Sequence, residues 1–242
     1  MAAAFLSLHP TFLKLPPADA APVLIRHLWT LGFTGAPASR YRALKNTHVG
    51  LTLRTIHSAI PLTLVAIFTA VAARCALTVH PVAFPGMIYA RVDTPAGPLF
   101  YDLYTAIPST GGLVPEAVLH AHATISGENL ARTHRRPART SDLVIRMAQN
   151  IIATLQLPQV NRLVASDGYP AVDEGAALYA ALTALVVLKG EWVSGNVVSH
   201  LTQQIPGTWP MDVRFLEEEL LPRIQSPAER MSLGNVCGAL RA

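Results

Sequence analysis

The most apolar stretch of the chain is Ile60–Ala73, which contains no charged residue and is followed by Arg74. A membrane-spanning helix needs about 20 apolar residues, whereas a run of about 10 to 14 is more often a buried core helix. Pro61 can occupy the first turn of a helix, where its missing N–H is not needed. The pattern therefore predicts a buried helix that begins near Pro61.

A shorter helical pattern precedes this stretch. Residues 22–31 carry an apolar stripe and are followed by Gly32, a residue type that commonly ends helices. The stripe consists of Val23, Ile25, Leu28 and Leu31. Pro16, Pro17 and Pro22 predict that the start of the chain is a poor helix.

Short runs rich in β-branched and aromatic residues follow Cys75. They span residues 76–82, 87–92 and 98–104 and are separated by turn-rich sequences. Runs of this length between such turns are typical of strands joined as hairpins. The pattern therefore predicts an antiparallel meander of three strands.

Helical periodicity returns in the second half of the chain. Helices are expected over residues 114–123, 142–157, 173–188, 194–205, 212–224 and 228–240, with Ser141 and Asp142 as the N-cap of the second. The elements together predict an α+β fold. A core in residues 1–126 is expected to be followed by a basic segment, residues 127–140, and by a helical region, residues 141–242.

Composition adds a constraint on the surface. Of the 242 residues, 51% are hydrophobic and 14% are charged, against about 25% charged in an average soluble domain. A disordered chain has the opposite balance, and two cysteines cannot form a disulfide framework. Without a credible signal peptide, a reducing compartment is expected, either cytoplasmic or nuclear. The low charge indicates either partial membrane association or a surface that a partner covers.

Seven short motifs then occur in order along the chain. They are LWTLGFTG (Leu28–Gly35), Tyr41–Thr47, AIPLTL (Ala59–Leu64), FPGM (Phe84–Met87), FYDLY (Phe100–Tyr104), Gly111–Leu113 and SDLVIRMAQNI (Ser141–Ile151). In this order they resemble the SirB-type transglutaminase-like family, which occurs in bacteria and as the middle region of fungal F-box proteins. The resemblance implies a papain- or transglutaminase-like core. In such a core, a cysteine at a helix start is activated by a histidine on one strand, and an aspartate on the next strand orients that histidine.

Two of the three catalytic positions that the resemblance implies differ from those of an active enzyme of this type. Pro61 stands at the cysteine position and Met87 at the histidine position, and only Asp102 is retained. Proline has no nucleophilic side chain, and a thioether cannot accept and deliver a proton at neutral pH. The resemblance therefore implies a catalytically inactive domain with vestigial positions. Asp102 is expected to be structural, accepting backbone N–H bonds from residues 108–112 or capping the next helix.

Other reactive residues offer alternatives. Cys75 falls at the expected C-terminal end of the core helix, where the helix dipole disfavours a thiolate, so Cys75 and Cys237 are expected to be buried packing residues. A hydrolase with atypical residues would need a cleft in which Asp102 meets a histidine such as His57 or His80. His120 and His122 are two residues apart, which is a poor chelate on a helix, so no metal and no cofactor are expected.

The basic segment holds four arginines that form a candidate site for an acidic partner, with a solvated linker as the alternative. They are Arg132, Arg135, Arg136 and Arg139. The net charge is only +4, and aromatic residues do not alternate with the basic ones, so no nucleic acid is expected.

The expected function is a protein-binding or scaffold module. The resemblance implies the substrate-recognition part of an F-box-type ubiquitin-ligase adaptor. The motifs begin too early in the chain to leave room for an F-box, so binding to the ligase scaffold would require an F-box outside this chain. A thiol-type hydrolase and a small membrane-associated protein remain the alternatives.

Overall fold

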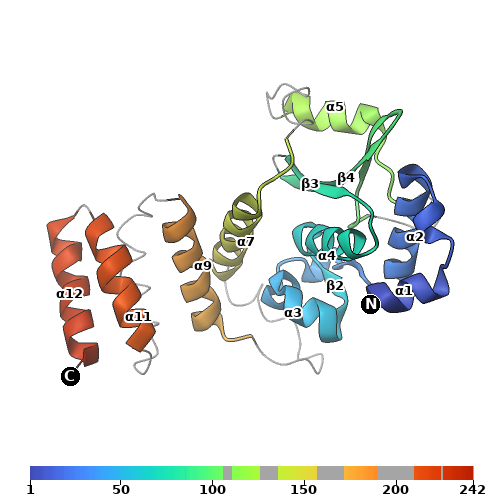
Figure 1. The fold of residues 1–242 in the computed structure, drawn as a ribbon. Helices are drawn as coiled ribbons and strands as arrows, with labels where there is room; N and C mark the ends of the chain where they lie inside the picture. The colour runs from blue at the N-terminus through green and yellow to red at the C-terminus, as the bar shows by residue number, and fades with distance from the viewer. Residues whose placement is uncertain are drawn as a thin grey trace. The chain divides into compact units, whose positions relative to one another are not determined.

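A computed structural model describes residues 1–84, 86–105, 111–125, 136–156, 172–189, 210–224 and 226–241. The chain divides into two compact units, with the division between Arg139 and Thr140. Figure 1 shows a first unit that combines helices with a small sheet and a second unit of helices. The expected mixture of helices and a small antiparallel sheet is confirmed.

The first unit is built from short helical segments around one long buried helix. Its helical elements are α1 (Ala2–Leu8), η1 (Phe12–Lys14), α2 (Pro17–Thr30), η2 (Ala38–Arg40), η3 (Leu44–Thr47), α3 (Val49–Leu51), η4 (Thr52–Ile56), α4 (Pro61–Arg74) and α5 (Glu116–Ile125). Its strands are β1 (Thr34–Gly35), β2 (Ser58–Ala59), β3 (Val79–Phe84), β4 (Met87–Thr94) and β5 (Gly97–Tyr101).

Helix α4 is the predicted core helix, and its predicted start is confirmed. Ile60 is the N-cap and Pro61 the first helical residue, followed by buried side chains that include Val65 and Phe68. Each such fully buried large side chain contributes about 1.5–3 kcal/mol. Among the described residues, no helix has the length and apolarity needed to cross a membrane.

The start of the chain is more helical than its prolines predict. Helix α2 begins at Pro17, where a proline is tolerated, and continues through Pro22. The lost hydrogen bond at Pro22 is offset by burial of side chains such as Leu24 and Leu28. Gly32, with a φ of 89°, ends this region as predicted: its N–H donates to the Trp29 carbonyl at 2.9 Å.

The meander β3–β4–β5 is antiparallel, as predicted. Val82 pairs with Tyr89 and Phe84 with Met87, so these four side chains share one face of the sheet. They pack with Leu119 of α5, while α4 contacts β3 and β4 from the other face (Figure 1). The two faces of the sheet therefore carry different helices.

The second unit contains α7 (Thr140–Leu155), α9 (Glu174–Lys189), α11 (Pro210–Phe215), η5 (Leu216–Leu220), η6 (Leu221–Arg223) and α12 (Pro227–Arg241). Leu182, Leu216 and Leu233 form part of its core. Helix α7 begins at Thr140, so Ser141 lies inside the first turn and is not the predicted N-cap. Asp173 does cap α9, because its carboxylate accepts the Ala176 N–H at 3.0 Å. The expected helix over residues 194–205 lies outside the described residues.

Candidate functional site

The first turn of α4 is closed by a hydrogen-bond network centred on Asn46. Asn46 is 1% exposed, and its side-chain amide donates to the Arg40 carbonyl over 2.6 Å. Its backbone oxygen accepts from the Thr63 hydroxyl at 3.1 Å and from the Ile60 N–H at 3.4 Å. Pro61 lies between these two donors in sequence and is buried. The expected nucleophile position is therefore enclosed and offers no reactive atom.

A second contact joins two of the motifs. A Cβ on Gly35 would lie 2.4 Å from the backbone oxygen of Tyr104, so only glycine fits this close approach. The Tyr104 hydroxyl donates to the Ala36 carbonyl over 2.6 Å. The loop after β5 is thereby fastened to β1, and the motif positions act here as packing residues.

Asp102 has the structural contacts expected of it, but with different donors. Its carboxylate accepts the Tyr104 N–H at 2.8 Å, the Thr105 N–H at 3.3 Å and the Thr105 hydroxyl at 2.6 Å. These bonds turn the chain, so β5 ends at Tyr101 and not at residue 104 as predicted. The Asp102 N–H donates to the Gly112 carbonyl at 2.8 Å, so within the described residues the 108–112 stretch accepts a bond where it was expected to donate one.

The structure brings Met87 and Asp102 to one pocket, which we call the α5-face pocket. Its volume is about 230 Å³. The lining residues are Met87, Tyr89, Asp102, Thr105, Gly112, Leu113, Val114, Pro115, Val118 and His122. Pro61 is not among them and begins the helix on the other face of the sheet. Two of the three positions that the resemblance singled out therefore line one pocket, and the third does not line it.

The α5-face pocket contains His122, which the sequence analysis did not predict to lie near Asp102. His122 follows Leu119 by three residues on α5, so the two share the helix face that meets the sheet. The expected partners of Asp102 lie elsewhere: His57 stacks on Phe33 with ring centroids 4.7 Å apart, and His80 lies 3.7 Å from Asp93. The spacing of His122 from Leu119 was the available signal.

Both cysteines are buried, as expected. Cys75 caps the C-terminal end of α4, and burial raises the pKa of its thiol. Burial also raises the pKa of the Cys237 thiol, and the nearby Glu217 carboxylate raises it further. A positive group lowers each pKa, the N-terminal ammonium at Cys75 and Arg241 at Cys237, but burial has the larger effect, so neither thiol is activated. No group of three metal-ligating side chains occurs in the described part of the chain.

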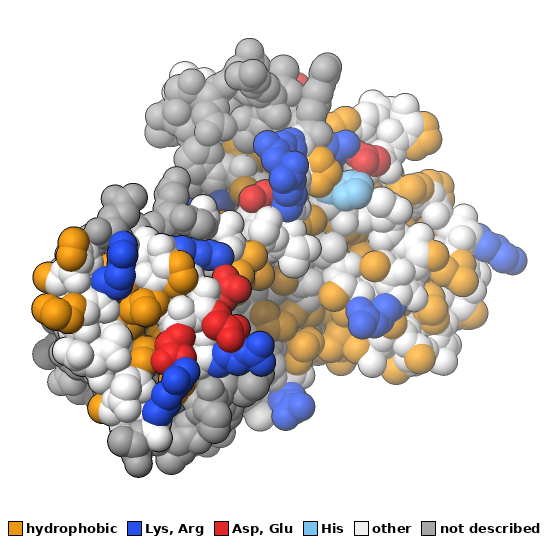
Figure 2. Space-filling model, turned by 60° about the vertical axis from the view of Figure 1, so that its left-hand side comes forward, with side chains coloured by type: hydrophobic (Ala, Val, Ile, Leu, Met, Phe, Trp, Pro, Cys, Tyr) orange, Lys and Arg blue, Asp and Glu red, His pale blue; other side chains and the backbone are white. Residues whose placement is uncertain are grey.

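The basic segment is described only at its end. Arg132 and Arg135 lie outside the described residues, whereas Arg136 and Arg139 are exposed. The N–H of Ala138 donates to the Pro81 carbonyl over 2.7 Å, which ties this end to the edge of β3. On the face drawn in Figure 2, basic side chains are dispersed and acidic ones lie close to several of them.

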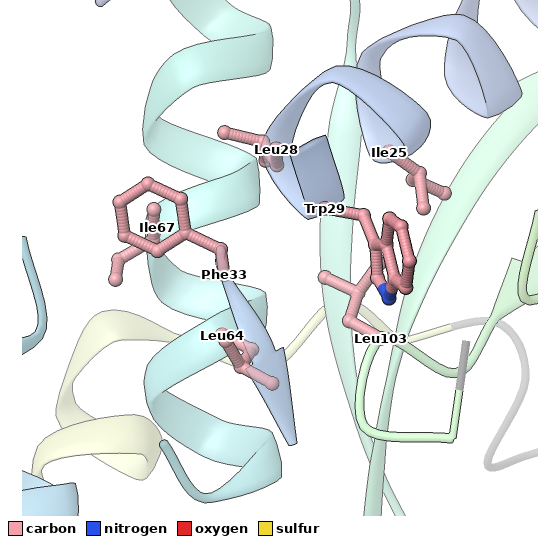
Figure 3. Close-up of a pocket in the computed structure, with 7 residues that line it drawn as sticks. All are labelled: Ile25, Leu28, Trp29, Phe33, Leu64, Ile67 and Leu103. Carbon is pink, nitrogen blue, oxygen red and sulfur yellow. The ribbon is translucent and has the colours of Figure 1, made fainter. Parts of the chain in front are cut away.

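A small apolar cavity lies between α2 and α4 (Figure 3). It is lined by Ile25, Leu28, Trp29, Phe33, Leu64, Ile67 and Leu103. Its volume of about 20 Å³ is close to the minimum for a single water. Leu103, next to Asp102, fills the space beside Trp29, so this side of the loop is packed and not open.

The first unit is thus a mixed helical and β domain whose core helix precedes an antiparallel sheet. A family model described as the transglutaminase-like superfamily matches residues 6–149 of the 242. Because the match covers more than half of the chain, the chain belongs to the transglutaminase-like superfamily. No curated protein and no solved structure matches the chain.

Proposed function

We propose that this chain is a transglutaminase-like domain without cysteine-type catalysis, acting as a protein-binding or scaffold module. The observation that carries the proposal is the proline at the first position of α4. A cysteine placed there would be favoured as a thiolate by the partial positive charge of the helix start. Proline supplies no nucleophile, and Pro61 is buried beside the hydrogen bonds of Asn46.

The position expected for a catalytic base supports the same conclusion. Met87 stands at the histidine position and packs with the cluster of Val82, Phe84 and Tyr89. Cys75 and Cys237 are buried in separate cores, and the pKa of each thiol is raised. Hydrolysis through a thiol would therefore require both an exposed thiolate and a base, and these residues supply neither.

The order of the seven motifs supports assignment to the SirB type within the superfamily. That assignment in turn supports a role as the substrate-recognition part of an F-box-type ubiquitin-ligase adaptor. Arg136 and Arg139, both exposed at the end of the basic segment, are suited to an acidic patch on a partner. The protein acts in the cytoplasm or nucleus in this proposal.

A hydrolase with atypical residues is the second candidate, and one observation favours it. Asp102 and His122 line the same pocket, so an acid and an imidazole are available near one another. Iodoacetamide labelling of the native chain tests the thiol-dependent form of this hydrolase. We expect Cys75 to react only after unfolding, whereas fast selective labelling of native Cys75 would favour the hydrolase.

A direct activity assay completes this test. We expect no incorporation of a fluorescent amine into a glutamine peptide and no hydrolysis of an activated ester above the rate in buffer. Turnover that survives Asp102→Asn would indicate a contaminant. Turnover that is lost in this variant would overturn the proposed absence of catalysis.

The binding role is tested by cross-linking and affinity purification of the tagged chain from its own cells. The matched variant is Arg136→Glu with Arg139→Glu, which reverses charge on exposed positions without touching a core. We expect recovery of ubiquitin-ligase components with the native chain and several-fold less with the variant. Recovery of other proteins without any ligase component would contradict the adaptor role.

A further inference from the structure

The α5-face pocket has features that packing alone does not explain. A cavity of about 10–15 Å³ already holds one water, and the pocket volume of about 230 Å³ is many times larger. One wall is apolar, with Leu113 and Val118 both well exposed at the pocket. Two polar residues, Asp102 and Tyr89, also belong to the lining. The pocket therefore has room for a group with an apolar stem and a polar head.

The Asp102 carboxylate is only 8% exposed. It accepts three hydrogen bonds, two on Oδ1 from the Tyr104 and Thr105 N–H groups and one on Oδ2 from the Thr105 hydroxyl. No Lys or Arg of the described part of the chain forms an ion pair with it. A carboxylate has about four acceptor sites, so Oδ2 retains capacity for another donor.

Tyr89 is a second polar residue of the pocket. It is 1% exposed and belongs to the lining. Burial, and then the charge of Asp102, raises the pKa of Tyr89 to about 12, which is consistent with a phenol oxygen near that carboxylate. A phenol oxygen accepts hydrogen bonds as well as donating one, so Tyr89 can supply the pocket with an acceptor beside Asp102. The Tyr89 ring and the His122 ring, 6.2 Å apart, add aromatic surface.

We propose that the α5-face pocket binds a guanidinium group, with its charge at Asp102 and its alkyl stem along Leu113 and Val118. A buried carboxylate without a cationic partner favours a cation. Guanidinium is more weakly hydrated than ammonium, offers five donors in one plane and stacks on aromatic rings. These properties match a pocket whose acceptors are spread over Asp102, Tyr89 and Thr105. The inference does not depend on whether the domain is catalytic.

The test is an NMR titration of the full chain with n-propylguanidinium, with n-propylammonium and the neutral N-propylurea as matched probes. We expect shifts in β4, α5 and residues 111–115 with the guanidinium. We expect binding at least fivefold weaker with the ammonium and none with the urea. Equal binding of the ammonium would overturn the assignment to guanidinium, and equal binding of the urea would overturn a charge-dependent site.

Variants locate the site. Asp102→Asn should weaken guanidinium binding about 10- to 100-fold, as expected for a lost charge-assisted bond. Because this change can also loosen the Tyr104–Thr105 turn, Tyr89→Phe is the second variant, expected to weaken binding about 2- to 10-fold without loss of stability. Tyr101→Phe makes the same change on the other face and should have no effect. Binding unchanged in both Asp102→Asn and Tyr89→Phe would overturn the proposal.

The same chemistry can come from a free small molecule or from an arginine side chain of a partner. Acetyl-Gly-Arg-Gly-amide distinguishes these sources. Binding at least tenfold tighter than that of n-propylguanidinium identifies a peptide arginine as the ligand, whereas weaker binding identifies a small guanidinium compound. Both results support the guanidinium site. If neither the peptide nor n-propylguanidinium binds, the proposal is overturned.

Discussion

At the scale of single residues, Gly35 provides a sharp test of the packing between motifs. A Cβ added there meets backbone, not a flexible side chain, at 2.4 Å from the Tyr104 oxygen. Gly35→Ala should therefore destabilise the protein by about 1–3 kcal/mol through overpacking. Chemical denaturation measures the difference in unfolding free energy.

Gly50 offers the matched control for this change. It lies in α3, and a Cβ there would meet nothing within 4 Å. Gly50→Ala should be neutral or stabilise by up to about 1 kcal/mol, because alanine favours a helix over glycine. Equal effects of the two substitutions would contradict the close approach at Gly35.

Two buried tyrosines predict a limit on stability at high pH. Burial raises the pKa of Tyr89 and of Tyr101 to about 12, with smaller contributions from Asp102 and Asp19 respectively. An unfolded phenol ionises near pH 10, so the folded state holds these groups neutral at a pH where the unfolded state loses their protons. The stabilisation is complete below about pH 10 and is lost between about pH 10 and 12.

The expected loss is up to about 2–3 kcal/mol for each tyrosine. Denaturation midpoints measured from pH 8 to 12 should fall steeply above pH 10 in the native protein. Tyr89→Phe and Tyr101→Phe should each remove part of this fall, and the double variant most of it. A slope that is unchanged in the double variant would assign the alkaline transition to other groups.

The sequence predicted that the cysteines and Asp102 have structural roles, but it did not predict which residues contact Asp102. The buried cysteines and the structural use of Asp102 follow from general preferences of those residues. The donors to Asp102 and the presence of His122 in its pocket depend on where β5 ends and how α5 crosses the sheet. Those features are set by long-range packing, which local sequence patterns do not encode.

At the scale of elements, the position of α4 relative to the sheet determines whether mutation can restore catalytic activity. Pro61 begins the helix on one face of the sheet, and Met87 lies in the pocket on the other face. The double variant Pro61→Cys with Met87→His should therefore gain no amine incorporation or ester hydrolysis. Activity above that of the single variants would show that the two positions can meet.

Helix α4 and the meander were predictable because each has a strong local signal. An uncharged apolar run after a proline predicts a helix start, and short β-branched runs between turns predict strands. Strands β1 and β2 were not predicted: they contain two residues each and pair in parallel, with Thr34 opposite Ser58. Such a pair forms only when two segments that are distant in sequence come together, so no local periodicity predicts it.

At the scale of the whole molecule, several of the few charged residues are paired with one another. In the second unit, Glu217, Glu218 and Glu219 pair with Arg241, Arg214 and Arg223 respectively. Charges that are paired in this way leave fewer free ones on the surface of the second unit, and in Figure 2 apolar side chains form scattered patches between the charged and the uncharged ones. This surface is consistent with the proposed role in binding a partner.

The division into two units predicts separate unfolding. Each unit has a hydrophobic core of its own, represented by Phe68 in the first and Leu216 in the second, both fully buried. A compact unit with its own core can unfold independently of its neighbour. Leu216→Ala should cost the second unit about 2–5 kcal/mol, and Phe68→Ala should cost the first unit about 3–5 kcal/mol.

Hydrogen exchange read by mass spectrometry distinguishes the two units. Leu216→Ala should accelerate exchange in α9, η5 and α12 and leave α4 and β4 unchanged, and Phe68→Ala should do the reverse. The two variants serve as controls for each other, because each removes a large buried side chain from one core. Faster exchange throughout the chain in either variant would show that the two cores unfold as one cooperative structure, and the chain would then act as a single folding unit.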